Sequence, residues 1–268
     1  MDRNWNELAD TAIIWVKEAG ELLRTSLNEQ LQIEVKANNG GLVTQMDRMI
    51  ESFFCKKIKE HFPQDGFLGE EGNRTEMDKR SGTLWIVDPI DGTTNYIYQQ
   101  YNFAISLAVY CEGIGQVGIV YNVIADELFY AVKGCGAYLN GTPLKKLGEV
   151  PISKGIIGLN ARWLIQSESK ERDAFVELIK CVRGVRSYGA AAIEIAYVAA
   201  GRLDGYISMR LSPWDFAAGI ILLSEVGGVF TSVDGQKIDI LRSSSVFVGN
   251  PAFHREVMES FVEKGMKA

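Results

Sequence analysis

Residues 85–98 read Trp-Ile-Val-Asp-Pro-Ile-Asp-Gly-Thr-Thr-Asn-Tyr-Ile-Tyr, and this stretch brings two aspartates, Asp88 and Asp91, to the end of a short apolar run. Residues 84–87 predict a strand, while Pro89 and Gly92 predict a turn after it. Open α/β sheets bind ligands in the crevice beyond the carboxyl ends of their strands. Asp and Gly are also common in turns for reasons of backbone conformation alone. The stretch is therefore either a ligand site or a plain acidic turn.

The composition is that of an acidic globular protein, with 268 residues, 47% of them hydrophobic, and a net charge of −6. This length allows one large domain or two lobes that share a core. An acidic chain without runs of Lys and Arg argues against direct nucleic-acid binding. Charges recur through the first 30 residues, and no membrane-spanning length is free of them. Neither a signal peptide nor a membrane partner is expected.

Cysteine and histidine usage narrows the chemistry. The four cysteines, Cys55, Cys111, Cys135 and Cys181, lack Cys-x-x-Cys spacing and predict buried thiols in a reducing cytoplasm. Only two histidines are present, and each stands beside a Phe, so both are interpreted as structural. The sequence therefore argues against a Ser-His-Asp triad or a zinc–histidine centre, because both require histidines that are free to act.

Hydrophobic periodicity predicts alternating helices and strands. We expect helices over 5–27, 44–62, 169–182, 189–200, 214–226 and 251–262, and strands over 31–35, 84–87, 103–110, 117–121, 127–133, 155–159, 203–208 and 246–248. Residues 38–41 predict a mobile loop, and 73–82 a surface loop. Glycine punctuation near 140–152 predicts an N-terminal lobe over 1–140, with most of the acids discussed below, and a C-terminal lobe over 141–268.

Two shorter motifs have competing interpretations. Residues 113–118 match Gly-x-Gly-x-x-Gly, but a strand follows them, so a hairpin is favoured over a dinucleotide site. Thr44 and Asp47 have the spacing of a helix-capping pair. Asp215 stands in the first turn of a helix entered through Pro213, where it is either a cap or a ligand.

Three acidic groups invite one explanation: Glu70 with Glu71, Asp88 with Asp91, and Asp215. Clusters of oxygen ligands select hard cations, and Mg²⁺ prefers a few carboxylates together with waters and phosphate oxygens. Two such ions can polarise a phosphoryl group and make water a better nucleophile. The sequence therefore predicts a phosphate-handling metal site that needs no histidine.

The motifs Gly69-Glu-Glu, Trp85-Ile-Val-Asp-Pro-Ile-Asp-Gly-Thr-Thr-Asn, Trp214-Asp-Phe-Ala-Ala-Gly and Glu225-Val-Gly-Gly resemble the inositol monophosphatase family of lithium-sensitive phosphatases. The resemblance runs from about residue 5 to 260. It implies an α/β fold with αβαβα layers, a cytoplasmic homodimer, and Mg²⁺-dependent hydrolysis of a small phosphate monoester. Two or three Mg²⁺ ions are implied, with Mn²⁺ as a substitute and Li⁺ and Ca²⁺ as inhibitors.

The resemblance also assigns roles to residues by position. The metal ligands would be Glu70, Asp88, the carbonyl of Ile90, Asp91 and Asp215, with Glu71 beside them or on a weaker third ion. Glu70, Asp47 and Thr93 would be catalytic, the last two by orienting the attacking water, with Lys36 nearby. Substrate binding would fall to Asp91, Gly92, Thr93, Asn160, Ala191, Ser208 and Arg210, of which Gly92 and Thr93 would donate backbone N–H groups to phosphate.

Two positions depart from the family pattern. Gly41 stands where an aspartate is usual, which affects the neighbouring loop and the third-metal environment. Ser208 stands where the animal enzymes have a glutamate that holds inositol, so selectivity for inositol is weakened. Arg210 could bind a second phosphate bidentately or form a surface ion pair. Inositol 1-phosphate, fructose 1,6-bisphosphate and NADP⁺ therefore all remain candidate substrates.

Two rival functions differ in class. A haloacid-dehalogenase-type phosphatase uses Asp-x-Asp, whereas three positions separate Asp88 from Asp91 here. A non-catalytic regulatory binding protein is the second rival, and the complete set of acids argues for an enzyme instead.

Overall fold

The computed structural model describes residues 3–36, 41–73, 82–160 and 170–262. The mobile loop expected at 38–41 and the surface loop expected at 73–82 lie mostly outside these residues. The helices are α1 (Trp5–Ser26), α2 (Gln45–His61), α3 (Thr93–Tyr98), η1 (Ile152–Lys154, 3₁₀), α5 (Lys170–Cys181), α6 (Ala191–Ala199), α7 (Pro213–Val226) and α8 (Pro251–Val257), which continues as the π-helix η2 (Met258–Val262).

Strands β1 (Ile33–Val35) and β2 (Leu42–Thr44) form a small antiparallel pair. A seven-stranded sheet contains β3 (Gly66–Gly69), β4 (Thr83–Asp91), β5 (Ala104–Cys111), β6 (Ile114–Asn122), β7 (Glu127–Val132), β8 (Gly136–Leu139) and β9 (Thr142–Pro143), in that order. A five-stranded sheet has the order β11 (Gly184–Arg186), β10 (Ile156–Leu159), β12 (Gly205–Leu211), β14 (Ser244–Gly249), β13 (Val229–Thr231).

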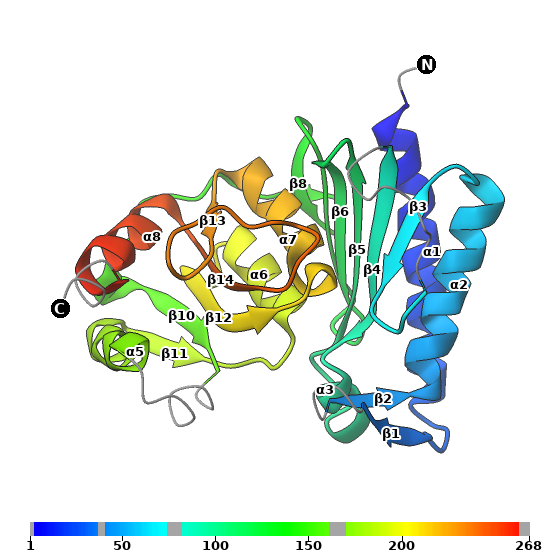
Figure 1. Cartoon of the computed structure of the whole chain (residues 1–268), viewed down its shortest axis with the longest axis horizontal. Helices are drawn as coiled ribbons and strands as arrows, with labels where there is room; N and C mark the ends of the chain where they lie inside the picture. The colour runs from blue at the N-terminus through cyan, green and yellow to red at the C-terminus, as the bar shows by residue number, and fades with distance from the viewer. Residues whose placement is uncertain (1–2, 37–40, 74–81, 161–169, 263–268) are drawn as a thin grey trace.

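The elements form five layers (Figure 1). Helices α1 and α2 cover one face of the seven-stranded sheet, and α6 and α7 lie between the two sheets. Helices α5 and α8 lie on the far side of the five-stranded sheet. Three clusters of buried apolar side chains join the layers: one lies at each outer interface, and the third extends from the seven-stranded sheet through α6 and α7 to the five-stranded sheet. The αβαβα fold class predicted from the sequence is confirmed.

The first sheet is mixed: β3 and β4 are parallel, and every later pair in it is antiparallel. The chain changes sheets between Pro143 and Ile156. This change falls in the region where the lobe boundary was expected, and the division of the chain into lobes stays a prediction.

The central motif is a longer strand than expected. Strand β4 continues through Asp91, so the turn predicted at Pro89 is wrong. Asp88 pairs with Ser106 and Asp91 with Ala104, which leaves one extra residue on β4. Such a bulge accommodates a proline, which cannot donate to the ladder. Gly92, at φ +89°, then turns the chain directly into α3, a helix that was not predicted.

The Gly-x-Gly-x-x-Gly stretch forms part of the β5–β6 hairpin, as expected. Two of its glycines, Gly115 and Gly118, serve packing against α7, whereas Gly113 lies in the turn at φ +72°. A Cβ on Gly118 would lie 2.5 Å from the carbonyl oxygen of Ala218, and one on Gly115 would lie 2.6 Å from the side chain of Ile221. Helix α7 therefore approaches the sheet closely where side chains are missing, and this approach brings its first turn near β4 and β5.

The prediction of buried thiols is wrong: all four cysteines are free, but Cys55 and Cys111 are only half-buried. Cys135 and Cys181 are exposed, because Cys135 lies in the tight turn after β7 and Cys181 ends α5. His254 is buried and its Nε2 forms a hydrogen bond of 3.0 Å with the Thr231 hydroxyl. Its ring stacks on Phe247, in keeping with a structural role. Within the described ranges, no helix is both long and apolar enough to cross a bilayer.

Candidate active site

Three aspartates from two layers meet between the sheets. Asp88 and Asp91 come from the bulged end of β4, and Asp215 comes from the first turn of α7. Each offers a carboxylate oxygen such that the three oxygens all lie within 4.8 Å of one another. Asp88 and Asp91 are buried and Asp215 is partly exposed. The structure thus brings together residues more than 120 positions apart.

The electrostatics of this cluster are unfavourable without a cation. Burial, followed by the negative charges of Glu70, Asp91 and Asp215, raises the pKa of Asp88 well above its ordinary value. Burial and Glu70 raise the pKa of Asp215 to about 7, against the N–H of Ser212. Like charges in a low dielectric disfavour ionisation of each other. Oxygen-only donors gathered in this way fit a hard divalent cation, which would neutralise them.

Asp91 has a structural partner that the sequence did not indicate. Its Oδ1 accepts the N–H of Ala191 at 3.2 Å, and its Oδ2 accepts the N–H of Ala192 at 2.6 Å. Helix α6 begins after Ala190, which has no capping side chain of its own. Asp91 therefore caps α6 from another layer, supplying negative charge to a helix N-terminus. Ala191 was predicted to contact substrate, and its N–H donates to Asp91 instead.

Asp215 serves as a cap as well as a member of the cluster. Its Oδ2 accepts the N–H of Ser212 at 2.7 Å, which completes a capping box at the start of α7. The two alternatives for this residue, cap or ligand, are therefore compatible. The capping hydrogen bond holds Oδ2 of Asp215 in place, and this orientation of the carboxylate keeps Asp215 within the acid cluster.

Glu70 and Glu71 follow β3 and meet Lys36. The Lys36 ammonium donates to Oε1 of Glu70 at 2.7 Å and to Oε1 of Glu71 at 2.5 Å. Burial lowers the pKa of Lys36, but the two glutamates raise it by more. Burial raises the pKa of Glu71 to about 6 despite Lys36. The lysine thus balances part of the negative charge, and Glu70 adds to the field at Asp88.

Asp47 and Thr93 also come together, as the resemblance implied. Asp47 is almost fully buried, and its Oδ2 accepts the N–H and hydroxyl of Thr44 at 2.7 and 2.6 Å. The Thr93 hydroxyl lies 3.3 Å from Oδ1 of Asp47 and 3.2 Å from the carbonyl oxygen of Ile90. Burial raises the pKa of Asp47. The predicted Thr44–Asp47 capping box is confirmed, and it orients the carboxylate toward Thr93.

Glu51 was missed by the sequence interpretation although it supports the site. It lies one helical turn after Asp47 on α2 and is fully buried. Its two oxygens accept the N–H groups of Glu71 at 2.6 Å and Asn73 at 2.9 Å. The i, i+4 spacing of two acids on one helix was the available signal. Glu51 therefore holds the turn that presents Glu70 and Glu71.

Glu51→Gln is expected to destabilise the protein by about 1–3 kcal/mol, because an amide NH₂ would face a backbone N–H and leave it unsatisfied. It should also raise the Mg²⁺ concentration needed for half-maximal activity. Urea unfolding and an activation curve measure the two effects. Glu60→Gln, at an exposed position of the same helix, is the control and should change neither. An unchanged Mg²⁺ requirement in Glu51→Gln would contradict the assigned role.

A cavity of about 210 Å³ adjoins the acid cluster. The predicted substrate residues Asp91, Asn160, Ala191, Ser208 and Arg210 all line it, together with Ser187, Gly189, Ala190, Glu194, Tyr206, Leu211 and Asp215. Gly92 and Thr93 do not line it and lie at the start of α3 instead. The structure therefore groups five of the seven predicted substrate residues around one space, from the end of β4, the residue after β10, the start of α6, and β12.

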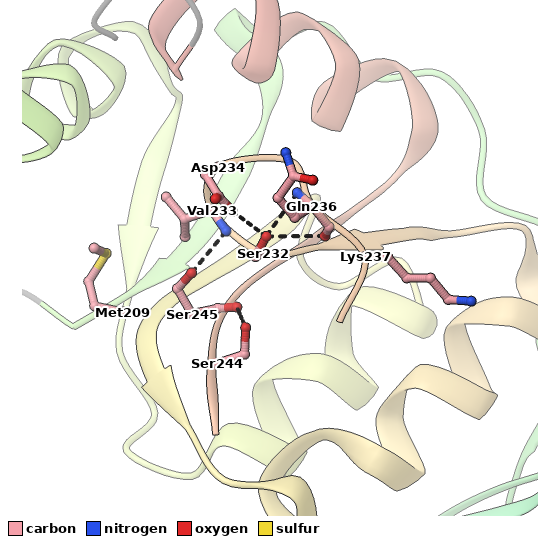
Figure 2. A pocket seen from close by; sticks show the side chains of 8 residues that line it. All are labelled: Met209, Ser232, Val233, Asp234, Gln236, Lys237, Ser244 and Ser245. Carbon is pink, nitrogen blue, oxygen red and sulfur yellow. Dashed lines mark hydrogen bonds between the residues drawn. The ribbon is translucent and has the colours of Figure 1, made fainter. Parts of the chain in front are cut away.

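A larger cavity of about 410 Å³ lies elsewhere on the five-stranded sheet (Figure 2). Ser232 contacts Asp234 and accepts the N–H of Gln236 at 2.9 Å, while the N–H of Val233 donates to Ser245 at 3.1 Å. These polar groups satisfy one another across a turn, as Figure 2 shows. We therefore place the candidate site at the smaller cavity, where buried charge is unbalanced.

The comparisons with known proteins identify the family of the chain. Residues 4–266 match the model of the Inositol monophosphatase family. The inositol-1-monophosphatase of Bacillus subtilis is 45% identical over 259 residues, covering 97% of this chain and 98% of that protein. Solved structures are similar as well, two of which follow. The 2′AMP-bound SaIMPase-II of Staphylococcus aureus has a TM-score of 0.89 at 38% identity, covering 97% of this chain and 96% of that one. An IMPase/NADP phosphatase complexed with Mg²⁺ and phosphate has a TM-score of 0.87 at 28% identity, covering 96% and 95%.

The fold and the acid cluster define a class of phosphatase, and the comparisons give its family. The chain belongs to the inositol monophosphatase family. It is accordingly a phosphoric monoester hydrolase, as the sequence predicted.

Proposed function

We propose that the protein is a Mg²⁺-dependent phosphomonoesterase that hydrolyses a small polyol phosphate similar to inositol 1-phosphate. The observation that carries the proposal is the meeting of Asp88, Asp91 and Asp215 beside a cavity that two of them line. Phosphate release from a panel of sugar, polyol and nucleotide phosphates tests it, with Mg²⁺ and with excess EDTA. Release from none of them would favour a non-catalytic regulatory binding protein instead.

The donor set proposed to hold the metal is the one that the resemblance implied: Glu70, Asp88, the carbonyl of Ile90, Asp91 and Asp215, with Glu71 at its edge. The unfavourable burial of these acids supports bound Mg²⁺, and two or three ions are proposed from the family resemblance. When bound, Mg²⁺ supplies positive charge that polarises the phosphoryl group and favours water as nucleophile. Mn²⁺ is proposed as a substitute, and Li⁺ and Ca²⁺ as inhibitors, which titration against fixed Mg²⁺ would test.

The chain's own residues position the nucleophile. Because the Thr93 hydroxyl has one proton, donating it to Asp47 leaves its lone pairs free to accept a hydrogen bond from water. Asp47 is held by Thr44 and cannot rotate away without losing two hydrogen bonds. Glu70, beside Asp88, is proposed to favour proton loss from the same water. The N–H groups of Gly92 and Thr93, in the first turn of α3, have no partner within the helix and could bind phosphate oxygens.

A second candidate substrate is a nucleotide or bisphosphate, including NADP⁺ and fructose 1,6-bisphosphate. The exposed Arg210 at the rim of the cavity supports it, because no described side chain forms an ion pair with its guanidinium. The small, buried Ser208 beside it leaves space where a longer acid would repel a second phosphate. Arg210→Ala should then reduce hydrolysis of a bisphosphate more than hydrolysis of a monophosphate.

Family membership also supports a homodimer in the cytoplasm, which stays a proposal. Sedimentation equilibrium at micromolar concentration tests the assembly, and a mass of one chain would contradict it.

The pH dependence of stability tests whether the acids are neutralised by metal. The ordinary pKa of Asp215 is 3.8, and it rises to about 7 on folding. Between these values the folded state holds a proton that the unfolded state has lost, so stability of the metal-free protein falls as pH rises from about 4 to 7. Mg²⁺ requires deprotonated ligands. We therefore expect saturating Mg²⁺ to raise Tm more at pH 8 than at pH 5.

Differential scanning fluorimetry with and without Mg²⁺ measures this effect. Asp215→Asn is the matched control, because it removes one titrating acid and should reduce the difference between the two pH values. Equal Mg²⁺ shifts at pH 5 and pH 8 would count against a carboxylate metal site.

A further inference from the structure

One row of side chains on strand β5 faces helix α7. Successive side chains of a strand point to opposite faces of its sheet. In β5 the row on the α7 side contains Ala104, Ser106, Ala108 and Tyr110, while the residues between them pack under α1 and α2. Ser106 is 1% exposed. A buried hydroxyl in a mostly apolar row needs a hydrogen-bond partner within the protein.

That partner belongs to the first turn of α7. The Ser106 hydroxyl donates to the carbonyl oxygen of Trp214 at 2.9 Å, and Trp214 directly precedes Asp215. On its own sheet, Ser106 is paired with Asp88 of β4. Side chains of such a cross-strand pair lie on the same face of the sheet, with Cβ atoms about 4.5–5.5 Å apart. One serine therefore links the strand that carries Asp88 to the helix that carries Asp215.

Other side chains also anchor α7 to the seven-stranded sheet. Tyr110 donates its hydroxyl to the carbonyl oxygen of Ala217 at 3.0 Å, but it is paired with Leu84 rather than with an acid. Glu225, in the last turn of α7, accepts two glycine N–H groups from the connection between β7 and β8, each at 2.8 Å. The Ser106 contact lies at the acid cluster, whereas the Glu225 contact lies at the opposite end of the same helix.

The spacing between β4 and the first turn of α7 determines how well the acids can hold a cation. The carboxylate oxygens of Asp88, Asp91 and Asp215 lie within 4.8 Å of one another. Like charges repel, so the metal-free cluster tends to push α7 away from β4. Mg²⁺ requires nearly ideal octahedral geometry at short ligand distances. A small retreat of α7 from the sheet would therefore weaken metal binding, and the Ser106 hydrogen bond opposes that retreat.

We propose that Ser106 is a positioning residue of the metal site, which keeps Asp215 close to Asp88 by holding the first turn of α7 against β5. The inference rests on the proposed Mg²⁺-dependent function and adds a residue that acts through the ligands. Trp214 lies within α7, so its carbonyl oxygen also accepts the helical N–H four residues later. Removing the serine hydroxyl should therefore loosen the position of the helix and leave the helix itself intact.

The test measures Mn²⁺ binding by wild type and Ser106→Ala from the loss of the electron paramagnetic resonance signal of the free ion. This readout does not depend on turnover, and carboxylate sites for Mg²⁺ also accept Mn²⁺. We expect the Kd to rise about tenfold in Ser106→Ala, as is common when a group that orients a metal ligand is removed. The Mg²⁺ concentration needed for half-maximal phosphate release should rise by a similar factor.

Glu225→Gln is the matched control, because it weakens the anchor at the far end of the same helix. Both variants should lower Tm, and only Ser106→Ala should weaken Mn²⁺ binding. Equal Kd values in wild type and Ser106→Ala, or an equal rise in both variants, would overturn the inference and leave Ser106 with a packing role. Absence of Mn²⁺ binding by the wild type would instead reject the metal site of the proposed function, and the inference with it.

Discussion

Asp88→Asn is expected to lower kcat about a thousandfold or more while the protein stays folded. Asn keeps the volume of the side chain and an oxygen that can accept the N–H of Ile90, which lies 3.0 Å from Oδ1 of Asp88. It loses the negative charge that the metal site requires. Asp215→Asn should behave in the same way. Phosphate release under saturating Mg²⁺ measures turnover, and near-ultraviolet circular dichroism verifies the fold.

Asp65→Asn provides a matched control in the same lobe. Asp65 is a buried aspartate that binds Arg3 at 2.6 Å and the indole N–H of Trp85 at 2.8 Å, away from the acid cluster. Its replacement should lower Tm and leave turnover near that of the wild type. Wild-type turnover in Asp88→Asn or Asp215→Asn would reject the metal site. An acid-stable phosphoenzyme on Asp88 would point to the haloacid-dehalogenase chemistry instead.

Thr93→Val should lower kcat about a hundredfold with little change in KM, because it removes the hydroxyl that is proposed to bridge Asp47 and the attacking water but retains the shape. The loss of one hydrogen bond to Asp47 leaves that carboxylate with its bonds to Thr44, so the fold should persist. Steady-state kinetics on the best ester of the panel measure both constants.

Thr93→Ser is the companion variant. It restores the hydroxyl without the methyl group and should recover most of the lost kcat. If Thr93→Val and Thr93→Ser were equally impaired, the methyl group rather than the hydroxyl would be the functional part, and the water-positioning role would be lost.

The sequence predicted much of this fold because its strongest signals are local. The amphipathic periodicity of α1, the capping pair at the start of α2 and the proline entry to α7 each depend on neighbouring residues only. Strand pairing depends on distant ones. The short strands β2, β8, β9, β11 and β13 were missed, since two to four residues carry little periodic signal.

The same contrast applies to the site. Carboxylates that follow apolar strands can be recognised from the sequence alone, and the motif around Asp88 made their assignment to a metal site specific. Glu51, Glu194 and the cap that Asp91 provides to α6 are not visible, because their partners are backbone N–H groups whose positions depend on tertiary structure. The bulge at Pro89 was misread as a turn for a related reason: a single extra residue in a strand is defined only by the partner strand.

The hydrogen bonds from Asp91 to α6 determine how a mutation of Asp91 would affect the protein in the cell. One carboxylate both belongs to the acid cluster and secures a helix in another layer. A substitution of Asp91 would have two separate effects: it would lower the activity of the protein, and it would lower its abundance because the destabilised chain is degraded faster. Damage at this position should therefore appear as low abundance before any assay of the purified protein is made.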